Sequence, residues 1–290
     1  MPIEFRCPHC GTQTSFPDSS AGPTGSCVGC GKPLTVPAPG GSEAYATPAE
    51  RWKLPNDRVV MMTGLGVFVM LVCGGLLLPL VISSRVNGRK FHCANCLQQI
   101  SMAMLIYEAD HGSFPPAYVA DKNGRPMHSW RVLILPYLGR RDLYEQYHFD
   151  EPWDGPHNRT LAHRMPWFYR CPSDTRNADS MTDYAVVVGP NTAFPGAKAV
   201  KLSDIPDGLQ NTLLVVEAAK AGIPWLEPRD LSEDRMQFKI NGDPNTEISS
   251  YHSQGANAAF CDGHTEFLSD SENARVLKDM VERNDGHPRN

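Results

Sequence analysis

The sequence has no stretch rich in lysine or arginine, and it has little excess of either charge. It contains 27 lysines and arginines against 32 aspartates and glutamates, a net charge of −5 at pH 7 over 290 residues. Proteins that bind the phosphate backbone of nucleic acids carry clustered positive charge. The composition therefore argues against a nucleic-acid partner.

Charge is also absent from residues 59–84, which are mainly valine, leucine, methionine and glycine. A helix of about 20 apolar residues is long enough to cross the hydrocarbon core of a bilayer. We therefore expect one transmembrane helix here, with the lipid bilayer as a partner.

Four of the nine cysteines form two Cys-x-x-Cys pairs near the amino terminus, each followed by a glycine. Two such pairs can supply the four thiolates of a closed tetrahedral zinc site, and the glycine permits the turn. Four protein ligands leave no position open for a substrate, so we expect a structural Zn²⁺ in a zinc ribbon over residues 1–36. The predicted ligands are Cys7, Cys10, Cys27 and Cys30.

Residues 37–58 are rich in proline, glycine and alanine, and they predict a linker between the ribbon and the membrane. Basic residues flank the apolar segment equally on both sides, so charge does not orient it. Metal-bound thiolates are kept reduced most easily in the cytoplasm. We therefore expect a single-pass protein of the cytoplasmic (inner) membrane, with the ribbon inside and residues 85–290 outside.

The pattern after residue 85 predicts helices followed by strands. Leu97, Ile100, Met104 and Tyr107 recur at helical spacing up to Gly112, and a short helical stretch is expected after Ser129. The β-branched runs at 184–188 and 212–216 predict strands. A capping box at 269–272 predicts the start of a final helix, whose apolar face is formed by Val276, Leu277, Met280 and Val281. The expected fold class is α+β: a zinc ribbon, one transmembrane helix and a domain whose helix packs on an antiparallel sheet.

The stretch YHSQGANAAFCDGHTEFL at 251–268 has two interpretations. His252, Asp262 and His264 are residue types that act as catalytic bases and their carboxylate partner, but no nucleophile accompanies them. The alternative, which we favour, is a hairpin with Asp262-Gly263 in a type I′ turn. His252 then serves a structural role by bonding to backbone groups, with metal binding alongside Asp262 or His264 as the remaining possibility.

The spacing of His252, nine residues and Asp262-Gly263 resembles the carboxy-terminal motif of a planctomycete family of type II secretion-like pseudopilins of unknown function. Several further motifs in residues 85–270 resemble that family in order: Cys93 with NCLQQI at 95–100, GSFPP at 112–116, GRPMHSWRVL at 124–133, CPSD at 171–174 and DGLQNTLLVVE at 207–217. The resemblance implies a pilin-like domain over residues 85–290. The sequence departs from the family in having no prepilin leader and no glutamate within the apolar segment, so the domain is expected to stay at the membrane.

Cys93 and Cys171 both belong to motifs shared with that family, and the resemblance favours them as a disulfide pair. The alternative is that these two cysteines, with Cys96 and Cys261, are small buried hydrophobic residues. Connectivity cannot be read from sequence, so both interpretations stay open.

No group of residues combines a nucleophile with a base or leaves a metal position open, so we expect no catalytic residues. The leading hypothesis is a non-enzymatic envelope protein for assembly or protein interaction, including self-association. The alternatives are a transmembrane sensor that couples an outer ligand to the ribbon, and a hydrolase that uses His252 and Asp262.

Overall fold

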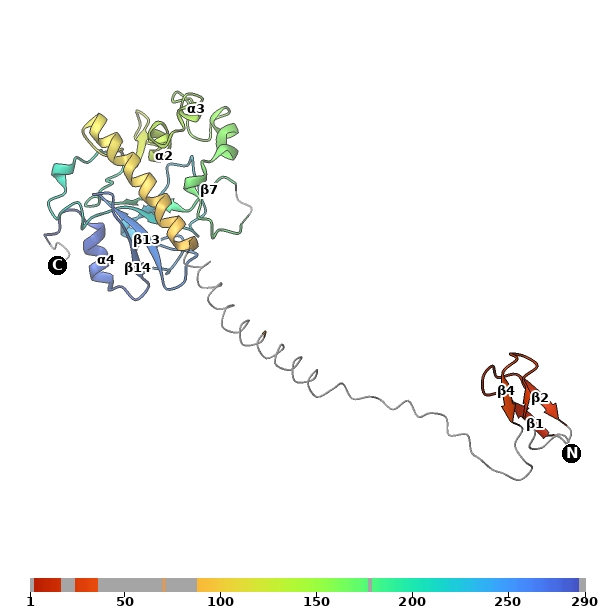
Figure 1. Ribbon diagram of the computed structural model, residues 1–290. Coiled ribbons are helices and arrows are strands. Elements are labelled where there is room, and N and C mark those ends of the chain that lie inside the picture. Colours follow the sequence, from red (N-terminus) through yellow and green to blue (C-terminus); the bar gives the residue numbers. More distant parts are fainter. Residues whose placement is uncertain (1–2, 17–23, 36–69, 71–87, 177–178, 287–290) are drawn as a thin grey trace. The chain divides into compact units, whose positions relative to one another are not determined.

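The computed structural model describes residues 3–16, 24–35, 70, 88–176 and 179–286 (Figure 1). The chain divides into two compact units, Met1–Leu71 and Val72–Asn290.

The amino-terminal unit contains two small antiparallel hairpins. Strand β1 (Ile3–Arg6) pairs with β2 (Gln13–Phe16), and β3 (Thr24–Ser26) pairs with β4 (Pro33–Thr35). A Cys-x-x-Cys pair lies in each turn, where Gly11 and Gly31 have φ of 77° and 70°. These left-handed conformations suit glycine, which explains why it follows each pair.

The long helix of the second unit is described over residues 88–111. The predicted buried face is confirmed, because Leu97, Ile100 and Met104 are all 0% exposed. The helix ends at Gly112, where φ is 73° and the amide donates to the carbonyl of Glu108 at 2.7 Å. A left-handed glycine of this kind is the common way for a helix to stop.

The predicted fold class is wrong in its membrane element. In the part of the chain that the structure describes, no helix has the length and apolar character needed to cross a membrane. The described helix at 88–111 includes the charged residues Arg89, Lys90, Glu108 and Asp110. The predicted segment 59–84 lies outside the described residues except for Met70, as does the linker at 37–58. The fold that the structure supports is a mixed α and β domain with few helices. The zinc ribbon in the predicted fold class is not supported either.

A four-stranded antiparallel sheet forms the centre of the second unit. Its order is β14 (Thr265–Ser269), β13 (Gly255–Phe260), β10 (Leu213–Glu217) and β8 (Tyr184–Ala185). Every residue of β10 and β13 is buried. Strands that are covered on both faces are mostly apolar or small residues, and in these two the exceptions are Glu217 and Asn257.

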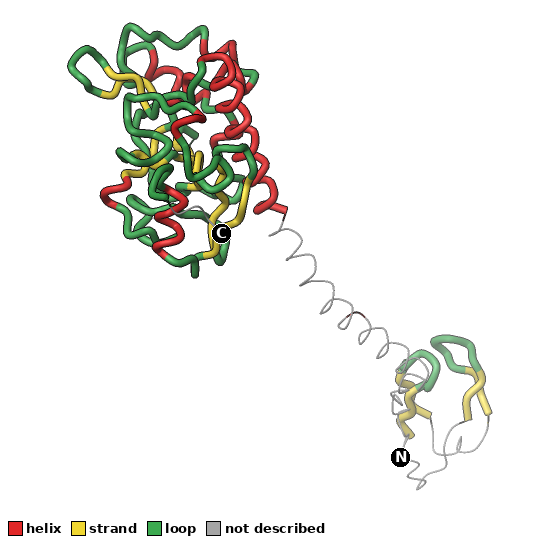
Figure 2. Tube along the Cα trace, turned by 90° about the vertical axis from the view of Figure 1, so that its left-hand side faces the viewer, coloured by secondary structure: helices red, strands yellow, loops and turns green. Residues whose placement is uncertain are grey.

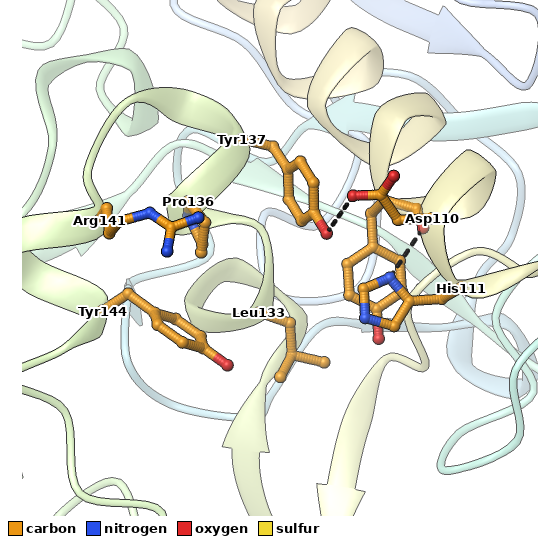
Figure 3. Close-up of a pocket in the computed structure, with 8 residues that line it drawn as sticks. Asp110, His111, Leu133, Pro136, Tyr137, Arg141 and Tyr144 are labelled. Carbon is orange, nitrogen blue, oxygen red and sulfur yellow. Dashed lines mark hydrogen bonds between the residues drawn. The ribbon is translucent and has the colours of Figure 1, made fainter.

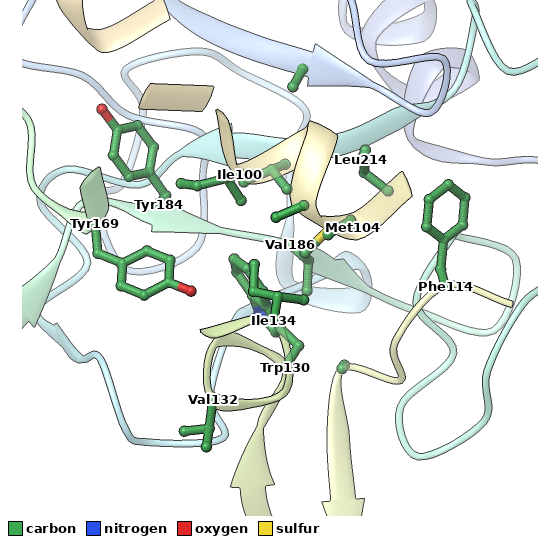
Figure 4. Packing of buried hydrophobic residues seen from close by; sticks show 14 of the residues in the cluster. Ile100, Met104, Phe114, Trp130, Val132, Ile134, Tyr169, Tyr184, Val186 and Leu214 are labelled. Atoms are coloured by element: carbon green, nitrogen blue, oxygen red, sulfur yellow. The ribbon is translucent and has the colours of Figure 1, made fainter. Parts of the chain in front are cut away.

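Two apolar clusters cover the two faces of this sheet. On one face, Ile100 and Met104 of the long helix pack with Leu214 and with side chains from the loops (Figure 4). On the other, α4 (Ala274–Val281) contributes Leu277, Met280 and Val281. Figure 2 shows the long helix along one side of this unit.

Short elements and loops make up the rest of the unit. Strands β5 and β6 form a hairpin, β7 pairs antiparallel with β11, and β9 pairs parallel with β12. The bounds are β5 Tyr118–Ala120, β6 Pro126–Ser129, α2 Trp130–Leu133, η2 Leu135–Leu138, α3 Arg141–Tyr144, η3 Asn158–Arg164, η4 Trp167–Tyr169, β7 Met181–Thr182, β9 Val187–Val188, η5 Leu202–Asp204, β11 Ile223–Pro224, β12 Leu231–Ser232 and η6 Glu233–Arg235. The predicted strand at 184–188 is therefore divided between β8 and β9, which have different partners.

The predicted hairpin at the end of the chain is confirmed, but its turn type is wrong. A type I′ turn requires positive φ at both central residues. Gly263 has φ of 93°, whereas Asp262 is not among the described residues with positive φ. The amide of Gly263 donates to Phe260 at 2.9 Å, and that of Phe260 donates to His264 at 3.0 Å. This is a three-residue loop closed by a left-handed glycine.

The final helix is also confirmed, with a different cap from the one predicted. Asn273 is the N-cap, and its side-chain oxygen accepts from the amide of Arg275 at 2.8 Å. The helix therefore begins after the predicted capping box at 269–272 and not within it.

A buried ion pair joins α2 to the loop before β12. The Arg131 guanidinium lies 2.6 Å from Asp230, and the side chains are 0% and 2% exposed. Asp230 also accepts from the indole of Trp130 at 3.2 Å and from the amide of Val186 at 3.0 Å. Arg131 donates in turn to the carbonyl of Tyr184 at 2.8 Å. Both charges are therefore fully bonded in the interior.

We expect Asp230→Asn to lower the free energy of unfolding by about 3–5 kcal/mol, because it leaves the Arg131 charge buried without its counter-charge. Urea denaturation measures this change. The matched control is Asp142→Asn, which breaks an exposed pair with Arg140 at 3.0 Å and should change stability little. Equal stability of the two variants would contradict the prediction.

Candidate functional site

Four side chains with metal-binding or nucleophilic chemistry meet inside the second unit. One ligand atom from each of Cys93, Cys171, Glu217 and His252 lies within 4.8 Å of the other three. All four residues are buried, with His252 the most exposed at 7%. We call this set the buried cluster.

Helix and sheet geometry place two members of the buried cluster. Cys93 lies on the buried face of the long helix, one turn before Leu97. Glu217 is the last residue of β10 and pairs with Tyr184 of β8. Asn257 of β13 holds the Glu217 carboxylate: its amide donates to Oε2 at 2.8 Å and its side chain to Oε1 at 3.1 Å.

Loops place the other two members. The amide of Cys171 donates to the carboxylate of Asp183 at 2.7 Å, and that of His252 donates to the hydroxyl of Ser250 at 3.1 Å. The His252 Nε2 atom then lies 3.8 Å from the Cys171 sulfur and 3.6 Å from Glu217 Oε1. One imidazole nitrogen thus faces both a thiol and a carboxylate.

The proximity of these groups changes how they titrate. A hydrogen bond from Cys93 lowers the pKa of Cys171 to about 5, and His252 lowers it further. The same bond raises the pKa of Cys93, and burial raises the pKa of Glu217. Burial alone would lower the pKa of His252, but Cys171 and the Glu217 charge together raise it. Proximity therefore makes the Cys171 proton easier to lose and the Cys93 and Glu217 protons harder to lose.

The predicted group of His252, Asp262 and His264 is not brought together as a whole. Asp262 and His264 lie 2.6 Å apart at the hairpin tip, where their side chains are 36% and 42% exposed. His252 precedes β13, whose six residues span about 20 Å to that tip. The partners of His252 are Cys171 and Glu217 instead.

The predicted disulfide pair, Cys93 and Cys171, is brought together in the buried cluster. Both are free cysteines in the structure, as are the buried Cys96 and Cys261. The bond therefore stays a prediction. Cys96 lies outside the cluster, with its sulfur 3.7 Å from the imidazole of His92.

Glu217 is the member of the buried cluster that was not predicted from the sequence as a site residue. A sequence signal for it exists, because it closes the apolar run TLLVV at 212–216. An acidic residue is rarely buried at the end of such a run without a partner. That pattern marks Glu217 as a residue with a specific role.

The four cysteines of the amino-terminal unit form a second group, with Cys7, Cys10, Cys27 and Cys30 sulfurs within 4.8 Å of one another. The Cys10 and Cys27 sulfurs lie 3.6 Å apart. This arrangement is compatible with the predicted structural zinc site, which stays a prediction.

A separate surface hollow of about 270 Å³ lies between the end of the long helix and η2 (Figure 3). The Tyr137 hydroxyl donates to Asp110 at 3.0 Å, and His111 stacks on Tyr107 with ring centres 3.9 Å apart. No member of the buried cluster lines this hollow. Asp110, His111 and Tyr137 thus already have partners within the lining itself.

Two overlapping stretches, residues 83–226 and 223–275, match the family described as "Protein of unknown function (DUF1559)". The chain belongs to this family. The matched stretches include all four residues of the buried cluster. No curated protein and no solved structure matches the chain. Membership confirms the expected kinship with a family of unknown function.

We expect His252→Ala to lower the melting temperature by about 2–10 °C, because it removes a buried polar partner of Cys171 and Glu217. His264→Ala, the control on the exposed hairpin tip, should leave the melting temperature nearly unchanged. Differential scanning calorimetry of both variants measures the effect. An unchanged melting temperature for His252→Ala would argue against a structural role.

Proposed function

We propose that the second unit is a non-enzymatic, pilin-like domain that associates with copies of itself through the outer side of its long helix. The observation that carries this proposal is an uncharged strip on that side of the helix, in which large apolar side chains are exposed to solvent.

Large exposed apolar residues mark this strip. Phe91, Met102 and Ile106 are 68%, 49% and 43% exposed. With 3.6 residues per turn, they fall within about 60° of one another around the helix and span about 22 Å along it. We call the side that they share the outer strip. Exposed apolar patches of this kind commonly mark contact surfaces.

The outer strip is suited to a second copy of the same chain. By helical spacing, the other residues on this side from Gly88 to Ala109 are uncharged, with glutamines at 98 and 99. The helix's charged residues, such as Arg89 and Glu108, fall outside the strip. Two identical neutral surfaces meet without like-charge repulsion, which is what a symmetric contact requires.

The arrangement of the buried cluster supports a non-enzymatic role. A cysteine beside a histidine is a nucleophile and base pair in some enzymes. Here Cys171 is only 1% exposed and His252 is only 7% exposed. A substrate needs access to the sulfur, and these burial values leave it none. The pseudopilin relationship suggested by the sequence motifs agrees with a role in assembly.

We expect Met102→Glu and Ile106→Glu each to weaken self-association at least about tenfold, because each places a charge in the contact. Sedimentation velocity of the full chain over a range of concentrations measures this. Association through other segments would be unaffected by these changes, so the comparison isolates the outer strip.

Ala274→Glu is the matched control, because it adds the same charge at an exposed position of α4. This variant should associate like the unaltered chain. A chain that is monomeric at every concentration, or variants that associate as strongly as the control, would refute the proposed contact.

A further inference from the structure

We propose that Cys93, Cys171, Glu217 and His252 bind one structural Zn²⁺ ion in the interior of the second unit. This site is separate from the four amino-terminal cysteines, and it does not depend on self-association. Its evidence is the geometry, burial and chemistry of the four side chains.

The spacing of the ligand atoms agrees with a tetrahedral zinc site. Zn–S bonds of about 2.3 Å and Zn–N and Zn–O bonds of about 2.0–2.2 Å place neighbouring S and N ligands about 3.5 Å apart, and N and O ligands about 3.4 Å apart. The observed separations are 3.8 Å from Cys171 Sγ to His252 Nε2 and 3.6 Å from that nitrogen to Glu217 Oε1. A contraction of a few tenths of an ångström brings these atoms to one metal ion.

The donor set favours zinc over other common cations. Thiolate and imidazole ligands suit Zn²⁺, whereas Ca²⁺ and Mg²⁺ take oxygen ligands. Two thiolates and one carboxylate carry three negative charges, which a divalent cation largely neutralises in a site without solvent. Without a cation, buried acidic groups of this kind tend to keep their protons, so metal binding at this site would release protons.

The surroundings of the buried cluster orient its ligands. Asn257 donates to both carboxylate oxygens of Glu217, at 2.8 Å and 3.1 Å. The Cys171 backbone is held by Asp183 at 2.7 Å. Hydrogen bonds to the ligating residues of this kind are typical of metal sites and fix the direction of each ligand.

The competing explanation is a disulfide between Cys93 and Cys171. A disulfide uses two members of the buried cluster and gives no reason for Glu217 and His252 to be buried against the sulfurs. A zinc ion uses all four. With four protein ligands the site is closed, so the ion would join the helix to the sheet without taking part in a reaction.

The test uses the full chain with serine in place of Cys7, Cys10, Cys27 and Cys30, which removes the amino-terminal thiolate group. This background is purified with a reductant and without chelator, and bound zinc is measured by mass spectrometry of the metal. We expect about one zinc ion per chain. Cys93→Ser and Cys171→Ser, each added to the background, should abolish that binding.

Cys96→Ser is the matched control, because Cys96 lies on the same helix and, like Cys93, is 0% exposed. It should keep its zinc. Absence of zinc from the background chain, or retention of zinc in Cys93→Ser, would overturn the proposal.

Two measurements on the background chain test the proposal even if the Cys93→Ser and Cys171→Ser variants fail to fold. Cobalt exchanged for zinc should give thiolate-to-metal charge-transfer absorption, and its absence would contradict the site. Free zinc at about a hundred times the dissociation constant should raise the melting temperature of the metal-free chain by about 5–10 °C. No shift on adding zinc would contradict the site as well.

Discussion

The packing of one face of the long helix against the central sheet is the constraint on which the rest of the second unit depends. Leu97, Ile100 and Met104 are fully buried on that face, and burying each such side chain contributes about 1.5–3 kcal/mol. The same face carries Cys93 one turn earlier, so apolar packing brings its thiol to the end of β10. The buried cluster is therefore positioned by the hydrophobic core and not by a loop that has to find its own conformation.

The interior holds two polar sites that differ in how their charge is balanced. In the first, Arg131 provides a positive partner for Asp230 at 2.6 Å, and backbone and indole groups complete the bonding. In the second, Glu217 accepts hydrogen bonds from Asn257 and Ser250, and two thiols and an imidazole lie beside it. The Lys90 ammonium interacts with its charge from outside the cluster. A balanced pair needs nothing from outside the chain. The buried cluster, with three groups able to carry negative charge, is the site at which a cation has a physical reason to bind.

Local patterns in the sequence predicted what is set by neighbouring residues. Helical spacing identified the buried face of the long helix and the face of α4 formed by Leu277, Met280 and Val281. The hairpin was found from Asp262-Gly263, but the turn type was not, because the left-handed conformation falls on Gly263 and not on Asp262. The membrane element of the fold class was wrong, since no helix among the described residues is both long and apolar enough to cross a membrane.

The remainder depends on contacts between distant segments. The run at 184–188 divides because Ala185 pairs with β10 while Val187 pairs with Leu231, about 40 residues away along the chain. The buried cluster likewise draws its members from positions 93, 171, 217 and 252. Cys93 lies about 180° around the helix from Met102. A bond at Cys93 therefore restrains rotation of the helix about its axis, so the direction in which the outer strip faces is fixed from inside the domain.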